Sequence, residues 1–157
     1  MDKLMKENFD AAFDALMGSE GGYSNNPADP GGETMWGITK RVALAHDYHG
    51  DMRLLPQEVA KAIAKAEYWD NCKCDDLADR LDFQVFDASY NSGAERANEW
   101  LAKAITGLTQ PLNLDVDRAI MRFNAIRLIF LTSLAPWATF SKGWARRIGG
   151  NLLRAAS

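Results

Sequence analysis

Apolar residues recur along most of this chain at intervals of three or four positions, which places them on one face of an α-helix. The first stripe consists of Met5, Phe9, Phe13 and Leu16, and the next position of the series is Glu20. No segment shows the sustained alternation of apolar and polar residues that a half-buried strand requires. The pattern therefore predicts a mainly α-helical fold whose first helix ends at a carboxylate on or just beyond its inward face.

Capping residues and prolines set the expected boundaries of the later helices. Thr39 is expected to cap a short helix over residues 40–48, and Ser141 to cap the last helix. Between them, the spacing predicts helices over residues 56–71, 82–90, 94–106 and 115–134. The expected buried stripe of the 56–71 helix is Val59, Ile63, Ala66 and either Trp69 or Asp70.

Residues 20–38 interrupt the helical pattern with turn-forming residues. Five glycines and two prolines fall in this stretch, and Gly21 and Gly22 directly follow Glu20. Glycine weakens a helix and lets the chain turn. We therefore expect loops here, with a short irregular hairpin over residues 23–38.

Composition excludes several classes of protein. With 47% hydrophobic residues and five tryptophans among 157 residues, the chain can bury a sizeable core, so disorder is not expected. A net charge of −3 does not support nucleic-acid binding, and it argues against global attraction to an anionic wall or membrane. Residues 142–154 are locally basic. They are interpreted as either a small anion-facing patch or a solvated helix face. We find no apolar run long enough to span a bilayer and expect no signal peptide.

Motifs for metals and cofactors are missing from the sequence. Cys72 and Cys74 are two ligands at most, too few for a zinc site, and are interpreted as free thiols. His46 and His49 are interpreted as exposed histidines at the end of a helix rather than as ligands of a weak metal site. No phosphate loop, dinucleotide fingerprint or Gly-x-Ser-x-Gly motif occurs. The sequence therefore predicts neither a metal nor a cofactor.

The carboxylates of the 20–38 segment suggest glycoside hydrolysis. Cleavage of a glycosidic bond needs a carboxylic acid whose pKa is raised by burial, and Glu20 has such a position. Asp29 can act as the second carboxylate, and Thr34 can hydrogen-bond a water held by Asp29. The alternatives remain open: Glu20 can bond backbone amides of the glycine loop, and Asp29 can belong to an ordinary turn.

Aromatic residues near this segment are candidates for stacking on sugar rings. Tyr23 and Trp36 lie in the same loop as the carboxylates, and Tyr90 lies farther along the chain. Aromatic side chains also fill protein cores, and the core is the favoured place for Trp69 and Trp144.

The run Glu20-Gly21-Gly22-Tyr23, with Asp29, Gly31-Gly32, Thr34 and Trp36-Gly37-Ile38, resembles glycoside hydrolase family 108, the N-acetylmuramidases of phage endolysins and secretion activators. Further similarities cover nearly the whole chain: Tyr68-Trp69-Asp70, Phe86-Asp87, Tyr90-Asn91-Ser92-Gly93 and Gly143-Trp144 with Arg146-Arg147.

This resemblance implies a lysozyme-like helical fold, with Glu20 as the general acid for the β-1,4 bond between N-acetylmuramic acid and N-acetylglucosamine. The order Glu, Asp, Thr is also similar to that of phage-type lysozymes. Eight residues separate Glu20 from Asp29, as in that class, and four separate Asp29 from Thr34, one fewer than in that class.

Family sub-regions would cover residues 1–88, the muramidase region, and 89–157, the predicted peptidoglycan-binding region. Each half alone would bury little surface, so we expect one compact unit over residues 1–157. The cleft would lie between an N-terminal lobe and the later helices, with Tyr90 and Asn91 on its opposite wall.

Two other functions remain open on the sequence alone: a lytic transglycosylase, and a non-catalytic peptidoglycan-binding or secretion-assisting module. The expected partner is the peptidoglycan glycan strand, the expected state a monomer, and nucleic acid is excluded. By analogy with endolysins, we expect synthesis in the host cytoplasm, release by a separate pore-forming holin, and action on the cell wall in the periplasm.

Overall fold

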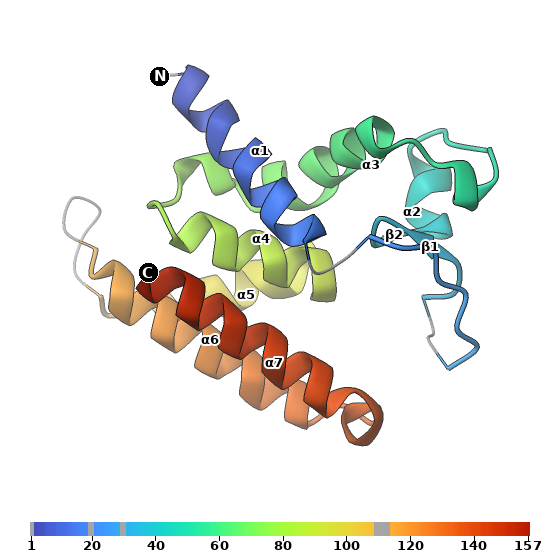
Figure 1. Cartoon of the computed structure of the whole chain (residues 1–157). Coiled ribbons are helices and arrows are strands. Elements are labelled where there is room, and N and C mark those ends of the chain that lie inside the picture. The colour runs from blue at the N-terminus through green and yellow to red at the C-terminus, as the bar shows by residue number, and fades with distance from the viewer. Residues whose placement is uncertain (1, 19–20, 29–30, 109–113) are drawn as a thin grey trace. The chain divides into compact units, whose positions relative to one another are not determined.

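The computed structural model describes residues 2–18, 21–28, 31–108 and 114–157, with side chains from Asn8 onward (Figure 1). The chain divides into two compact units, Met1–Asp75 and Asp76–Ser157. Helices dominate both units, and the described strands form one small hairpin, as the sequence predicts. The expectation of a single compact unit stays a prediction. The sub-region boundary expected near residue 88 lies inside a helix of the second unit.

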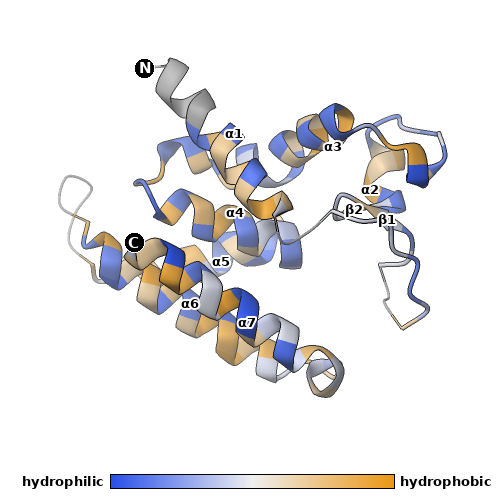
Figure 2. Cartoon of the chain, viewed as in Figure 1, coloured by the Kyte–Doolittle hydropathy of each residue, from blue (hydrophilic) through white to orange (hydrophobic). Residues whose placement is uncertain are grey.

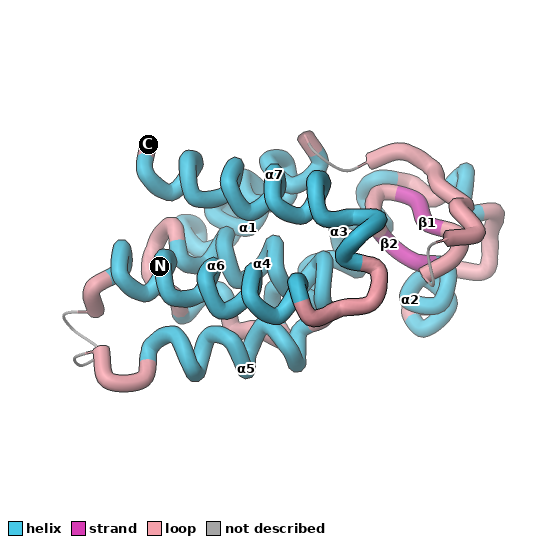
Figure 3. The backbone as a smooth tube through the Cα atoms, turned by 90° about the horizontal axis from the view of Figure 1, so that it is seen from below, coloured by secondary structure: helices cyan, strands magenta, loops and turns pink. Residues whose placement is uncertain are grey.

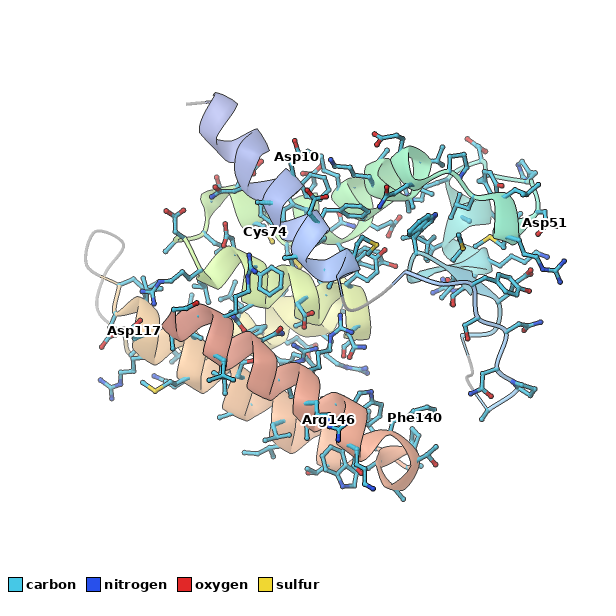
Figure 4. All side chains as sticks on the ribbon, in the orientation of Figure 1. Asp10, Asp51, Cys74, Asp117, Phe140 and Arg146 are labelled. Atoms are coloured by element: carbon cyan, nitrogen blue, oxygen red, sulfur yellow. The ribbon has the colours of Figure 1, made fainter. Side chains whose placement is uncertain are left out.

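The first unit is built on helix α1, Asp2–Met17. Phe9, Phe13 and Leu16 are buried, which confirms the inward stripe expected from the sequence. The ring of Phe9 meets the ring of Trp69 edge-on, with 5.4 Å between centroids. Asp10, labelled in Figure 4, forms an ion pair with Lys61, with 3.0 Å between its Oδ1 and Lys61 Nζ. These contacts hold α1 against the segment that contains residues 61–69.

Strands β1, Thr34–Met35, and β2, Ile38–Thr39, form a two-stranded antiparallel hairpin. Met35 pairs with Ile38, which leaves Trp36 and Gly37 as a two-residue loop. Both loop residues have positive φ, 55° and 74°, which are the angles of a type I′ turn. The expected hairpin is therefore present, with a regular turn.

Helix α2, Lys40–Ala45, follows the hairpin directly, and the Thr39 hydroxyl accepts the Val42 amide as predicted for an N-cap. The helix ends three residues earlier than expected, because the chain reaches a left-handed conformation at Asp47, φ 61°. A 3₁₀ turn, Met52–Leu54, then leads to helix α3, Gln57–Ala64.

A π-helical segment, Lys65–Asp70, continues directly from α3. Trp69 is fully buried, as predicted, but Ala66 is exposed, contrary to the expected stripe. A π-helix has more residues per turn than an α-helix, so the inward positions shift along the sequence. A 3₁₀ turn at Cys74–Asp76 follows.

The second unit is organised around helix α4, Leu81–Ser92, whose residues 81–90 are all buried. Three helices pack around it: α5, Ala94–Ile105, α6, Val116–Thr132, and α7, Trp137–Ala156. α5, α6 and α7 lie side by side in the view of Figure 3. Because α4 is covered on several sides, its polar residues must find partners inside the unit.

The last helix begins earlier than the sequence suggested. Pro136 stands at the N-cap of α7, and Ser141, the predicted cap, lies inside the helix. Trp137, Phe140 and Trp144 stack on its first two turns, with ring centroids of Trp137 and Trp144 6.0 Å apart. A proline can stand at the start of a helix as well as after its end. The prediction that Ser141 caps the last helix was therefore wrong. None of the described helices is long and apolar enough to cross a membrane.

Candidate active site

The residues predicted for the site fall into three groups. Glu20 and Asp29 lie outside the described residues, and their roles stay predictions. Tyr23, Thr34 and Trp36 lie together in and beside the hairpin of the first unit. Tyr90 and Asn91 lie near the end of α4, in the second unit. The geometry described below is therefore that of each unit separately.

A backbone bridge joins the segment after Glu20 to strand β1. The Ser24 amide donates to the Thr34 carbonyl at 3.0 Å, and the Thr34 amide donates to the Ser24 carbonyl at 2.8 Å. This pair adds a third, one-residue strand to the hairpin. Since Thr34 is also paired with Thr39 in the hairpin, its backbone is fixed from both sides. Its side chain is half-buried at the centre of this small sheet.

Glu33 is an acidic residue of this site that sequence reasoning did not select. Its Oε1 accepts the Tyr23 hydroxyl at 3.0 Å, and its Oε2 lies 3.2 Å from Lys40 Nζ. The Lys40 amide also donates to the Glu33 carbonyl at 2.9 Å. The carboxylate thus holds Tyr23 and the start of α2 together. Tyr23 lies ten positions away across a loop, so only the fold shows the pairing.

The ring of Tyr23 is half-buried and has one face occupied. The guanidinium of Arg53 lies over it, 5.1 Å from the centroid. Arg53 belongs to the 3₁₀ turn that follows α2, so this turn contacts the same hairpin edge. A sugar ring that stacked on Tyr23 would therefore have to use the other face or displace Arg53. Tyr23 remains a candidate contact, with its hydroxyl already committed to Glu33.

Trp36 is held in an unusual backbone conformation in the hairpin loop. A positive φ is costly for a bulky side chain, and such strain persists only where surrounding contacts fix it. The indole Nε1 donates to the Leu55 carbonyl at 2.8 Å. A Cβ added to Gly21 would lie 3.6 Å from the Trp36 ring. The residue that follows Glu20 in sequence is thus packed against an anchored, half-exposed indole.

We predict that Gly21→Ala lowers the free energy of unfolding of the first unit by about 1–3 kcal/mol. Gly21 has φ 152°, a conformation that side chains rarely adopt, whereas Gly22 does not and has no neighbour near an added Cβ. Gly22→Ala is therefore the matched control and should change stability by less than about 0.5 kcal/mol. Urea titration followed by tryptophan fluorescence gives both values. Equal effects of the two substitutions would refute the local strain.

The residues predicted on the opposite wall are less accessible than a stacking role suggests. Tyr90 is 9% exposed, and its ring packs edge-on against Phe86, 5.8 Å between centroids. Asn91 is exposed at the next position. A pocket of about 380 Å³ opens beside them, lined by residues 92–96 and Glu99. The roles of Tyr90 and Asn91 stay predictions, with Asn91 the more available of the two.

A buried ionic network organises the second unit. Asp87 and Arg147 belong to motifs of the sequence, whereas Arg127 and Asn151 do not. Asp87 on α4 accepts Arg127 of α6 at 2.7 Å. It also accepts Arg147 at 3.0 Å and Asn151 at 2.7 Å, both from α7. Burial alone would raise the pKa of the Asp87 carboxyl, but the charges and hydrogen bonds of Arg127 and Arg147 hold it below its ordinary value. Asp87 is therefore an anion that ties three helices together.

In the described part of the chain, no group of three or more histidine, cysteine or acidic residues could hold a metal ion. His49 is exposed, as expected. His46 is instead half-buried, because it contacts Glu67 at 2.6 Å and joins the end of α2 to the π-helical segment. Cys72 and Cys74 are buried thiols that form no disulfide, as expected.

Comparison with known proteins gives two positive findings. The family model described as Glycosyl hydrolase 108 matches residues 13–93, slightly more than half of the chain. Among solved structures, the chain is similar to SagA of Brucella abortus, with a TM-score of 0.86 and 29% identity over 96% of this chain and 95% of that one. A search of curated proteins gave no match. The matched stretch contains the hairpin, α2, α3, the π-helical segment and α4.

Proposed function

This chain belongs to the glycosyl hydrolase 108 family, and from that membership we propose that it hydrolyses the β-1,4 bond between N-acetylmuramic acid and N-acetylglucosamine. Family membership implies a glycosidase that degrades peptidoglycan. The choice of this bond rests on the motif around Glu20 and on the family resemblance. The single observation that carries the proposal is the family match over residues 13–93, which includes the whole Glu20 motif.

We propose Glu20 as the general acid that protonates the leaving oxygen. Four positions before it, Leu16 is completely buried, and the position after it is packed on Trp36. In the sequence, Glu20 continues the inward stripe of Phe9, Phe13 and Leu16, and burial at such a position would favour the neutral form of its carboxyl group. A raised pKa is what a general acid needs in order to carry a proton at neutral pH.

Asp29 is the proposed second carboxylate, which stabilises the oxocarbenium-like transition state or activates water. Thr34 is the proposed partner of that water. Support for Thr34 comes from its backbone, which is fixed by pairing with both Ser24 and Thr39. A rigid backbone is what a residue needs to orient a water molecule closely.

Trp36 and Tyr23 are the proposed sugar contacts in the first unit, and Tyr90 and Asn91 in the second. Trp36 has the stronger support, because its indole is half-exposed while its nitrogen is already bonded to Leu55. An aromatic ring fixed at its polar edge loses little conformational entropy when a sugar binds.

The proposed setting is cell-wall lysis of the endolysin kind. In this setting the protein is made in the host cytoplasm as a monomer, a separate pore-forming partner releases it, and it acts on the wall. Neither nucleic acid nor a cofactor takes part in the proposed reaction.

Purified sacculi test whether the chain is an enzyme or only a binding module. Wild-type protein should lower the turbidity of a sacculus suspension and release soluble reducing ends. A non-catalytic module would sediment with the sacculi and leave turbidity unchanged. A lytic transglycosylase would release only 1,6-anhydro products, which are lighter by one water molecule, and this outcome would reject hydrolysis.

A further inference from the structure

Positive charge is concentrated at the C-terminal end of the chain. Residues 118–157 contain seven basic residues and no acidic residue, whereas positions 1–117 hold all 21 acidic residues. This stretch forms most of α6 and all of α7, which pack against each other. The net charge of −3 therefore conceals a cationic helical pair within the second unit.

Four of these seven basic side chains make contacts within the second unit, and the other three are exposed. Arg127 and Arg147 point inward to Asp87, and Arg154 lies over the Phe83 ring at 4.6 Å. Arg122 donates to backbone carbonyls of α5 and its following turn. The remaining three, Arg118, Lys142 and Arg146, are exposed; Arg146 is labelled in Figure 4.

Exposed apolar side chains lie along the same helix faces. On α6, Met121 and Ile129 are eight positions apart, about two turns, and are 58% and 70% exposed. Arg118 stands one turn before Met121 on this stripe. On α7, Lys142, Arg146 and Leu153 share one face, and Leu153 is 75% exposed. Hydrophobic and hydrophilic positions alternate along the ribbons of α6 and α7 in Figure 2.

An aromatic cluster stands at the turn between the two helices. Trp137, Phe140 and Trp144 are half-buried and stack on one another, with 5.7 Å between the Phe140 and Trp144 centroids. Phe140 is labelled at this end of α7 in Figure 4. Tryptophan prefers boundaries that are apolar on one side and wet on the other. The cluster therefore suits the same environment as the neighbouring mixed face.

We propose that these outer faces dock on an anionic lipid surface. The docking surface, here called the α6/α7 face, consists of Arg118, Met121, Ile129, Lys142, Arg146 and Leu153. Basic residues near an anionic membrane attract its headgroups, and exposed apolar side chains of an interfacial helix enter the boundary with the acyl chains. The two helices lie on the surface in this mode, and the described helices contain none that could span it.

The chemistry of the α6/α7 face favours lipid over other occupants. A soluble polyanion would use Lys142 and Arg146 but would gain nothing from Ile129 or Leu153. A second copy of the chain in a two-fold dimer would set this face against itself. Its basic residues would then meet each other without any acidic partner, because residues 118–157 have none. An anionic lipid surface satisfies both the charge and the apolar positions.

The negative charge of the rest of the chain does not prevent this docking. Charges are screened beyond about 8 Å at physiological ionic strength, so contact depends on the groups that face the membrane. Attraction should accordingly be short-ranged and should weaken as salt increases. The global charge argument from the sequence thus applies at long range only.

Vesicle flotation with the full-length protein tests the proposal. Vesicles of equal parts phosphatidylglycerol and phosphatidylcholine should carry the wild type, and pure phosphatidylcholine vesicles should carry little. K142Q/R146Q should lower the affinity for the anionic vesicles by roughly 25-fold, about fivefold for each removed charge. R41Q/K103Q removes two exposed charges elsewhere and is the matched control, which should bind as the wild type does.

A second pair of substitutions separates lipid from the other occupants. I129Q/L153Q keeps all charges and strong helix propensity, and should lower vesicle binding at least roughly tenfold. Helical circular dichroism should be unchanged in every variant, and the wild type is assayed for sacculus lysis without vesicles, so a failure of docking is distinguishable from a failure of the proposed enzyme.

Three outcomes would overturn the proposal. Equal binding to both kinds of vesicle, or equal loss in R41Q/K103Q, would show that the α6/α7 face is not the docking surface. Retained binding of I129Q/L153Q, together with tight binding of dextran sulfate, would assign the face to a soluble polyanion. A wild-type dimer that I129Q/L153Q dissociates, with no vesicle binding, would assign it to a second copy of the chain.

Discussion

Glu20→Gln should reduce the rate of sacculus lysis by roughly 10²- to 10⁴-fold, the range that a general acid contributes. Glutamine keeps the size and hydrogen-bonding shape of the side chain but cannot donate the proton that the leaving oxygen needs. Binding of the glycan strand relies on other groups, so the variant should still sediment with sacculi. Initial rates of turbidity loss for matched protein concentrations give the ratio.

Glu58→Gln is the matched control for this substitution. Glu58 is an exposed glutamate in the first turn of α3, and it lies outside the hairpin and the predicted site. The same change there should leave the rate within about twofold of the wild type. If Glu20→Gln were as active as this control while remaining folded, another group would have to be the acid.

Asp87→Asn should lower the free energy of unfolding of the second unit by about 3–5 kcal/mol, the cost of breaking a buried ion pair. The substitution removes the charge that compensates Arg127, whose guanidinium is completely buried. Arg147 and Asn151 would share a single neutral amide oxygen in place of the carboxylate, so α6 and α7 would both lose their ionic contact with α4. Urea titrations of the two proteins measure the difference.

Asp117→Asn is the corresponding surface control. Asp117 pairs with Arg80 at 2.7 Å, but its side chain is 71% exposed. Surface pairs contribute about 0–1 kcal/mol, so this variant should unfold close to the wild type. A loss from Asp87→Asn no larger than that from Asp117→Asn would show that the buried network is not important for stability.

The pH dependence of the Asp87 effect has a definite sign. The pKa of Asp87 in the folded protein lies below its ordinary value of 3.8. Its contribution to stability is therefore complete above the ordinary value, and it is lost as the pH falls through the folded-state pKa. The gap between wild type and Asp87→Asn should stay constant from pH 7 to about pH 5 and narrow only below 3.8. If the stability difference between wild type and Asp87→Asn narrowed between pH 7 and about pH 5, the lowered pKa of Asp87 would be contradicted.

The sequence predicted local structure well where one helical period continued. Phe9, Phe13 and Leu16 are buried as expected, and Thr39 caps α2. Prediction failed where the helical period changed and where a proline could mark either the start or the end of a helix. The π-helical segment brings Ala66 to the surface, and Pro136 starts α7 although a proline also ends helices.

Pairings across the fold could not be read from residue spacing. Asp87 meets partners that are 40, 60 and 64 positions away, on two different helices. Glu33 stands inside the motif of the predicted site, yet its bonds to Tyr23 and Lys40 depend on the bridge between Ser24 and Thr34. Arg127 did give a signal, since a charge within an apolar helix usually has a buried partner. The sequence could not say which acid that partner is.

Mass analysis of the soluble products decides whether the enzyme hydrolyses the glycan at N-acetylmuramic acid. Sacculi are digested with wild-type protein, the products are reduced with borohydride, and a Glu20→Gln digest is the blank. We expect fragments that end in reduced N-acetylmuramic acid and are nearly missing from the blank. Fragments ending in reduced N-acetylglucosamine, fragments ending only in 1,6-anhydro sugar, or equal yields from both proteins would contradict it.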